Sequence, residues 1–319
     1  APILLDGLSK LEYRGYDSAG LAVFDGKTIN IAKAQGRLKN LSNLTNEGTN
    51  LGGTLGIGHT RWATHGIPSD TNAHPHFNED ESIVIVHNGI IENYVKIKKN
   101  LESKGYKFKS ETDTEVVALL LDYYYNSEPL ETIEKVLSKL EGSYALGIIF
   151  KDHPDEFYAV RKDSPLIVGE GKNGKFIASD VPAILKYSRD VYFIENEEIV
   201  KLTRDKITFY NMDLEEIKKE TTLVNWDISA AEKGGYPHFM LKEIHEQLET
   251  DNPYVSFEIA YIDGDWEKVL EYKDKVRLNG RKETQITESY IKLNRLDEAE
   301  EFAELVGNPD LIKMIEQYR

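Results

Sequence analysis

The sequence contains no cysteine among its 319 residues. Disulfide bonds, thiolate metal sites and cysteine nucleophiles are therefore excluded for the sequence as written. No apolar run approaches the roughly 18 residues of a membrane-spanning helix. No charged segment followed by an apolar one opens the sequence, so we expect no secretion and a cytoplasmic protein. Acidic residues outnumber basic ones by 55 to 39, and the net charge of −16 disfavours nucleic acid and anionic membranes as partners.

Composition predicts a folded chain with two domains. Hydrophobic residues make up 40% and charged residues 29%, which is typical of globular proteins. A single core rarely grows beyond about 250–300 residues. Residues 1–247 hold 20 of the 23 glycines and all eight histidines, whereas residues 248–319 hold 10 basic and 17 acidic residues. We therefore expect one domain over 1–247 and a smaller one over 248–319.

The first zone combines helix and strand patterns. Apolar residues at helical spacing predict helices over 3–11, 92–104, 114–125 and 133–140. Short β-branched runs predict strands over 20–24, 28–31, 55–60 and 82–87. Seven further strand-like runs follow between 144 and 210. Helices that cluster early and strands that dominate late favour an α+β fold with antiparallel sheets over a doubly wound parallel sheet.

The tail predicts a small all-α unit of helical hairpins. Amphipathic stretches occur over 266–275, 285–293, 296–306 and 311–318. Residues 260–266 and 290–296 match at an offset of 30. In both segments small or turn-forming residues stand between two predicted helices, and large residues are placed to fill the contact between those helices. The pattern resembles tetratricopeptide-type hairpins, whose period is about 34 residues, and it is equally typical of other helical hairpin bundles.

Residues 11–20, LEYRGYDSAG, place charged and aromatic side chains at a predicted helix-to-strand junction. Such a segment can form a pocket wall. Taken alone, it favours an ordinary turn with a satisfied Arg–Asp pair.

Residues 59–66, HTRWATHG, follow a predicted apolar strand. Loops at such points are where a rigid scaffold presents binding groups. The guanidinium of Arg61 offers a fork of donors that matches a carboxylate, and Trp62 can close over a ligand and exclude water. This interpretation is favoured over a buried tryptophan beside an incidental arginine.

Asn88 and Gly89 follow the strand predicted over 82–87. An asparagine amide and the next N–H can both point at a developing oxyanion. Asn-Gly is also the commonest dipeptide of β-hairpin turns. This segment alone therefore predicts a turn as readily as an oxyanion hole.

Residues 110–115, SETDTE, stand at the start of a predicted helix. Acidic and hydroxyl residues there are usual capping residues, and a cap is the default interpretation. A carboxylate among them could also bind a substrate ammonium group.

The first zone also contains five closely spaced histidines: His59, His65, His74, His76 and His87. Their spacings do not match the pairs of a helical zinc motif, because proline separates His74 from His76 and no two stand four apart on a predicted helix. We expect no metal and no cofactor.

Taken in order, these segments resemble one family. The motifs are LEYRGYDSAG, HTRWATHG, NAHPH, VHNGIIENY, SETDTE, GSYALGII, SPLIVG, FIASD and GGYPHFMLKEIHEQ. Residues 1 to about 247 are similar to the glutaminase domain of the glutamine–fructose-6-phosphate aminotransferases, also called glucosamine-6-phosphate synthases. The resemblance implies a class II glutamine amidotransferase, an N-terminal nucleophile hydrolase with a four-layer αββα sandwich. It also implies a supply of ammonia from glutamine for glucosamine 6-phosphate synthesis from fructose 6-phosphate.

The resemblance gives four residues a direct part in holding the substrate. Arg61 would hold the α-carboxylate of glutamine, and Asp113 would hold its α-ammonium group. The Asn88 side chain and the Gly89 N–H would form the oxyanion hole.

The resemblance places four more residues around the substrate. Thr64 and His65 would line the glutamine pocket, and Trp62 would lie on the mobile loop that gates ammonia passage. Arg14 would stand beside the nucleophile.

The sequence departs from the family at two points. The family starts with a catalytic cysteine whose α-amino group serves as base, followed by a glycine-rich strand and then the helix that here begins near Pro2. Neither Ser18 nor Thr64 replaces that cysteine, because neither lies at the chain start. We therefore expect the chain as written to bind glutamine or glutamate without hydrolysing it. The family continues after Leu248 into two sugar isomerase domains, whereas an acidic helical tail follows here.

A hypothesis from a different class stays open. The chain can be a non-enzymatic glutaminase-like scaffold whose helical tail binds a protein partner. The sequence is compatible with a homo-oligomer under either hypothesis.

Overall fold

The computed structural model describes residues 1–172, 174–224 and 253–319. The chain divides into two compact units, Ala1–Glu232 and Lys233–Arg319. The predicted boundary between 247 and 248, and the motif GGYPHFMLKEIHEQ, lie outside the described residues.

The first two layers of the N-terminal unit are a helix pair and a three-stranded sheet. The helices are α1 (Pro2–Ser9) and α2 (Leu38–Leu44), with the 3-10 helix η1 (Glu12–Arg14) following α1. The strands β1 (Ser18–Phe24), β2 (Ile29–Gln35) and β3 (Leu55–Arg61) pair in the order β2-β1-β3. Leu5 and Leu8 of α1 pack with Leu21 of β1, so these helices cover the outer face of this sheet.

The third layer is a seven-stranded sheet of order β13-β12-β11-β7-β6-β5-β4. Its strands are β4 (His76–Phe77), β5 (Ile83–Ile91), β6 (Gly142–Phe150), β7 (Phe157–Lys162), β11 (Ile199–Leu202), β12 (Ile207–Tyr210) and β13 (Glu216–Ile217). Alternate residues of β5 face opposite layers, as a strand requires. Ile83 and Ile85 face the helical core, whereas Val84 packs with Phe24 and Ile57 of the three-stranded sheet.

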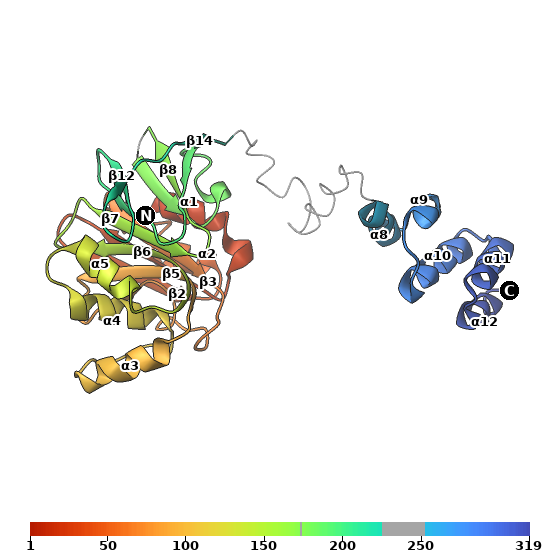
Figure 1. The fold of residues 1–319 in the computed structure, drawn as a ribbon, viewed down its shortest axis with the longest axis horizontal. Helices are drawn as coiled ribbons and strands as arrows, with labels where there is room; N and C mark the ends of the chain where they lie inside the picture. Colours follow the sequence, from red (N-terminus) through yellow and green to blue (C-terminus); the bar gives the residue numbers. More distant parts are fainter. Residues whose placement is uncertain (173, 225–252) are drawn as a thin grey trace. The chain divides into compact units, whose positions relative to one another are not determined.

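The fourth layer consists of α3 (Tyr94–Ser103), α4 (Thr114–Tyr124) and α5 (Pro129–Leu137), which lie on one side of the seven-stranded sheet (Figure 1). The apolar run of α4 is buried against Ile83 and Ile85 of β5. All strand pairs in the sheets are antiparallel. The predicted four-layer αββα sandwich is therefore confirmed.

A further four-stranded sheet of order β14-β10-β8-β9 lies beside α1. Its strands are β8 (Ile167–Gly171), β9 (Gly174–Ala178), β10 (Asp190–Phe193) and β14 (Thr222–Leu223), with the 3-10 helix η2 (Val181–Ala183) after β9. The segment after η2 is joined to α1, because Lys186 and Tyr187 both donate hydrogen bonds to Asp6.

The described part of the C-terminal unit, residues 253–319, is all helical, as predicted. Its elements are α8 (Pro253–Asp263), α9 (Trp266–Tyr272), the 3-10 helix η4 (Lys273–Lys275), α10 (Gly280–Lys292), α11 (Leu296–Val306) and α12 (Pro309–Glu316). None of the described helices is long and apolar enough to cross a lipid bilayer.

The 30-residue offset in the sequence relates equivalent turns of two hairpins. Gly264 and Asn294 both have a positive φ, of +72° and +59°. The N–H of the next residue closes each turn at 2.9 Å, onto the carbonyl of Ala260 in one hairpin and of Tyr290 in the other. A hydrophobic core within this unit includes Val269 and its offset partner Ala299.

Candidate active site

A cavity of about 1230 Å³ lies in the N-terminal unit, where β3, β5 and the start of α4 meet. All eight predicted site residues line it: Arg14, Arg61, Trp62, Thr64, His65, Asn88, Gly89 and Asp113. Residues of α1, of β9 and of the segment around η2 line it as well. The fold thus brings together residues that are up to about 100 positions apart in the sequence.

Arg61 is the last residue of β3 and is only 4% exposed. Its Nη2 donates to the carbonyl oxygens of His65 and Gly66, the latter at 3.0 Å. Its Nη1 lies 3.8 Å from Oδ1 of Asp17 and makes no hydrogen bond within the part of the chain that the structure describes. Buried donors normally have an acceptor, so this nitrogen is suited to a ligand carboxylate.

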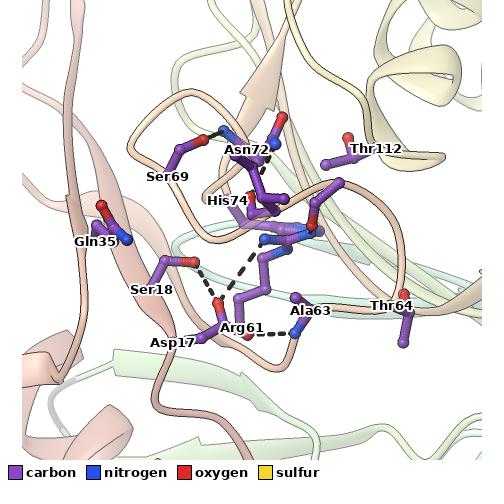
Figure 2. A network of polar contacts seen from close by, with 12 residues as sticks. Asp17, Ser18, Gln35, Arg61, Ala63, Thr64, Ser69, Asn72, His74 and Thr112 are labelled. Atoms are coloured by element: carbon purple, nitrogen blue, oxygen red, sulfur yellow. Dashed lines mark hydrogen bonds and ion pairs between the residues drawn. The ribbon is translucent and has the colours of Figure 1, made fainter.

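Hydrogen bonds and an ion pair hold the loop after β3 in place, and Figure 2 shows those among Asp17, Arg61 and Ala63. The carboxylate of Asp17 accepts the N–H of Ala63 and, at 2.8 Å, the hydroxyl of Ser18. Arg61 holds the far end of the loop through two carbonyls. Sequence reasoning did not assign Asp17 to the site, although it stands directly before a buried strand in the LEYRGYDSAG motif.

The Arg–Asp pair expected for residues 11–20 is not formed within that segment. Arg14 pairs with Asp180, at 2.5 Å, and Asp17 faces Arg61 instead. The side chain of Arg14 is 46% exposed, and the residue lines the cavity.

Asp113 lies at the N-cap position of α4 but does not cap the helix. Its Oδ2 accepts the N–H of Ile91 in β5 at 2.9 Å, and its Oδ1 lies 3.9 Å from Nδ1 of His65. The residue is 4% exposed. The capping interpretation is therefore wrong for this carboxylate, which reaches across to the sheet and stands near the buried guanidinium of Arg61.

Asn88 and Gly89 lie inside β5, where they pair with Ala145 and Tyr144 of β6. The hairpin-turn interpretation of this dipeptide is therefore wrong. Gly89 has a φ of +125°, and an added Cβ would come within 2.1 Å of the carbonyl oxygen of Ser143. Only glycine fits here, because other residues are strained at such φ values and have no room.

Comparison with known proteins decides the family of this unit. Residues 59–186 match the family described as a glutamine amidotransferase domain. The N-terminal unit is a glutamine amidotransferase domain. The chain is 59% identical over 245 residues to glutamine–fructose-6-phosphate aminotransferase [isomerizing] of Clostridium acetobutylicum, and 49% identical over 245 residues to that of Thermus thermophilus. Each match covers 77% of this chain and 40% of the relative, so the chain spans about two fifths of the length of these relatives.

Solved structures agree on the fold of the amidotransferase domain. Glutamine phosphoribosylpyrophosphate amidotransferase from B. subtilis, solved with ADP and GMP, is similar with a TM-score of 0.59 and 25% sequence identity. The match covers 68% of this chain and 48% of that one.

Two further predicted residues of the amidotransferase domain lie on the loop after β3. Trp62 is 59% exposed and packs edge-on against the ring of Tyr16, with centroids 5.2 Å apart. His65 packs edge-on against Tyr94, and its Nδ1 lies 3.3 Å from the hydroxyl of Thr64. Both side chains lie beside the cavity, as expected for residues that contact a ligand.

Histidines gather near Asn88. His74, His76 and His87 are buried, and the half-buried ring of His59 stacks on His74 with centroids 4.2 Å apart. Burial lowers the pKa of His59 to about 4 and holds the pKa values of His74 and His76 well below 6.5. Among the described residues no three histidine or acidic side chains are grouped to hold a metal ion. Sequence reasoning had considered these histidines only as metal ligands.

Proposed function

We propose that the amidotransferase domain binds glutamine through its amino-acid end. The α-carboxylate accepts a hydrogen bond from Nη1 of Arg61, which faces Asp17 at 3.8 Å without bonding to it, and the α-ammonium group faces the carboxylate of Asp113. The side-chain amide then points along the cavity toward Asn88 and Gly89. The observation that carries this proposal is the buried Nη1 that has no hydrogen-bond acceptor within residues 1–172, 174–224 and 253–319, beside a buried carboxylate in one cavity. A cation and an anion placed in this way are complementary to an amino-acid zwitterion.

We further propose that this domain supplies ammonia for the formation of glucosamine 6-phosphate from fructose 6-phosphate. Support comes from relatives at 49–59% identity, which are glutamine–fructose-6-phosphate aminotransferases. A polypeptide of these 319 residues contains no thiol and is expected to bind glutamine or glutamate without cleaving it.

Thr64 does not act as the nucleophile in this proposal. In a Ser-His-Asp-type triad, one imidazole nitrogen serves as the base for the hydroxyl while a carboxylate holds the other nitrogen. Here the same Nδ1 of His65 faces both the Thr64 hydroxyl, at 3.3 Å, and Asp113, at 3.9 Å.

Replacing Arg61 tests the proposed carboxylate contact. We expect Arg61→Ala to weaken L-glutamate binding by about 1.5–3 kcal/mol, because a charged hydrogen bond is lost. Arg61→Lys should weaken glutamate binding less, since lysine keeps the positive charge but not the paired N–H donors of the guanidinium. Titration calorimetry measures both affinities, and Arg37→Ala is the control, because Arg37 is exposed and does not line the cavity. Equal affinities of wild type and Arg61→Ala would reject the assignment.

We propose that the C-terminal unit is a separate tetratricopeptide-like module for a protein partner. Two hairpins with equivalent turns and a hydrophobic core within the unit support this proposal. Ending the chain after residue 250 should leave the affinity for L-glutamate unchanged, and residues 252–319 should give a helical circular dichroism spectrum. A changed glutamate affinity in the shortened chain would contradict independence of the two units.

A further inference from the structure

The orientation of Asn88 decides whether it can stabilise an oxyanion. An asparagine amide presents a donor at one end, its NH₂ group, and an acceptor at the other. The donor end stabilises a developing negative charge, whereas the carbonyl end would repel it. Rotation of the amide by half a turn exchanges the two ends, so a neighbouring group must select the orientation.

His59 is the group that contacts Asn88 in this way. Its Nε2 lies 2.8 Å from Oδ1 of Asn88. The two residues come from different sheets, His59 from β3 and Asn88 from β5. Since Oδ1 only accepts hydrogen bonds, Nε2 must carry the proton for this contact to form.

The surroundings of His59 favour that tautomer. Burial holds its pKa near 4, so at neutral pH the ring carries a single proton. Its Nδ1 is shielded from solvent and makes no well-aligned hydrogen bond among the described residues, and the backbone of His87 also interacts with the ring, whereas Nε2 lies 2.8 Å from the acceptor Oδ1 of Asn88. The proton is therefore best placed on Nε2.

The ring of His59 is held in place by a second histidine. His74 stacks on it with an interplanar angle of 19°. Nδ1 of His74 accepts the N–H of His87 at 3.3 Å, and its Nε2 lies 3.5 Å from the hydroxyl of Thr114. His74 is thus fixed from β5 and from α4, and it limits the tilt of the His59 ring.

We propose that His59 is a positioning residue of the glutaminase site: its Nε2–H holds Oδ1 of Asn88, which turns the Asn88 NH₂ toward the side-chain carbonyl of bound glutamine. The inference rests on the proposed function, because it presumes that glutamine binds with its side chain near Asn88.

Two ligands separate this role from a merely structural one. L-Glutamate ends in a carboxylate that can accept a hydrogen bond from Asn88, whereas L-norvaline has the same carbon chain but ends in a methyl group. His59→Leu should weaken glutamate binding by about tenfold and leave norvaline binding unchanged. His59→Gln, which keeps an N–H donor, should retain most of the glutamate affinity.

Two further variants serve as controls. In an Asn88→Ala background, His59→Leu should cause no additional loss, because its effect passes through Asn88. His76→Leu removes a neighbouring histidine that contacts Thr112 rather than Asn88, and it should leave the ratio of the two affinities unchanged. Nitrogen NMR of the His59 ring in the unliganded chain should show a protonated Nε2 and an unprotonated Nδ1.

The proposal is overturned if the proton lies on Nδ1, if His59→Leu leaves glutamate affinity unchanged, or if it weakens both ligands equally. Failure of the proposed function looks different, since the wild-type chain would then bind neither ligand. In that case the NMR result still decides whether His59 donates to Asn88, and an Nε2 without a proton overturns the inference by itself.

Discussion

A polypeptide of these 319 residues should release no ammonia from glutamine above the rate of a heat-denatured control. The same polypeptide preceded by the cysteine-led strand of the family should release ammonia at least about a thousandfold faster. The physical reason is that the cavity holds groups for binding and charge stabilisation, but the sequence contains no thiol to attack the amide. A coupled assay for ammonia and glutamate measures both rates.

The matched control for this experiment is the same added strand with alanine in place of its cysteine. It should restore the strand but not the activity. Ammonia release by the 319-residue polypeptide itself would show that another residue acts as nucleophile. It would contradict the proposal that these residues bind glutamine without cleaving it.

A synthetic peptide carrying the family's cysteine-led strand should bind along β3 and raise the melting temperature. β3 is an edge strand of its sheet, and all of its residues, Leu55–Arg61, line the cavity. Edge strands offer unpaired N–H and C=O groups to an added strand. At a peptide concentration of 100 times Kd the stabilisation is about 2.7 kcal/mol.

Thermal unfolding with and without peptide measures this stabilisation. A peptide with proline at alternate positions is the control, because proline cannot donate the main-chain hydrogen bonds. An unchanged melting temperature at saturating peptide would show that the cavity does not accept a strand and would contradict the proposed mode of addition.

Among the described residues, the sequence predicted most elements of the fold but missed the helices α2 and α8 and the two-residue strands β4, β13 and β14. α2 is short and contains Asn40, Ser42 and Asn43, which are weak helix formers, so its helical pattern is faint. Burial of Leu38 and Leu41 in the α1 and β1 core stabilises it, and this is tertiary packing. The segment that forms α8, PYVSFEIAYID, is rich in aromatic and β-branched residues, whose local preference is for strands.

The site was harder to predict where a local signal competed with a distant partner. Asn88 and Gly89 form a turn dipeptide, but pairing with Ala145 and Tyr144 keeps β5 extended through them. Asp113 stands where a helix cap is expected, yet its carboxylate accepts a hydrogen bond from the N–H of Ile91 instead. In both cases contacts from other parts of the chain outweigh the preference of a few neighbouring residues.

Ion pairs could not be predicted from the sequence for the same reason. Arg14 and Asp180 are 166 positions apart. Arg61 faces Asp17 because β1 and β3 pair antiparallel with Ser18 opposite Arg61, which places Asp17 next to the end of β3. The resemblance to a known family placed Arg61 and Asp113 in one pocket, and the cavity contains both. It did not assign Asp17 or His59, whose contacts position the loop and Asn88.

The most direct test of the proposed binding mode is a crystal structure of the chain with L-glutamate. We expect an oxygen of the α-carboxylate within hydrogen-bonding distance of Nη1 of Arg61, the ammonium group on Asp113, and the side-chain carboxylate at Asn88. Glutamate bound in the reverse direction, or outside the cavity, would contradict the account.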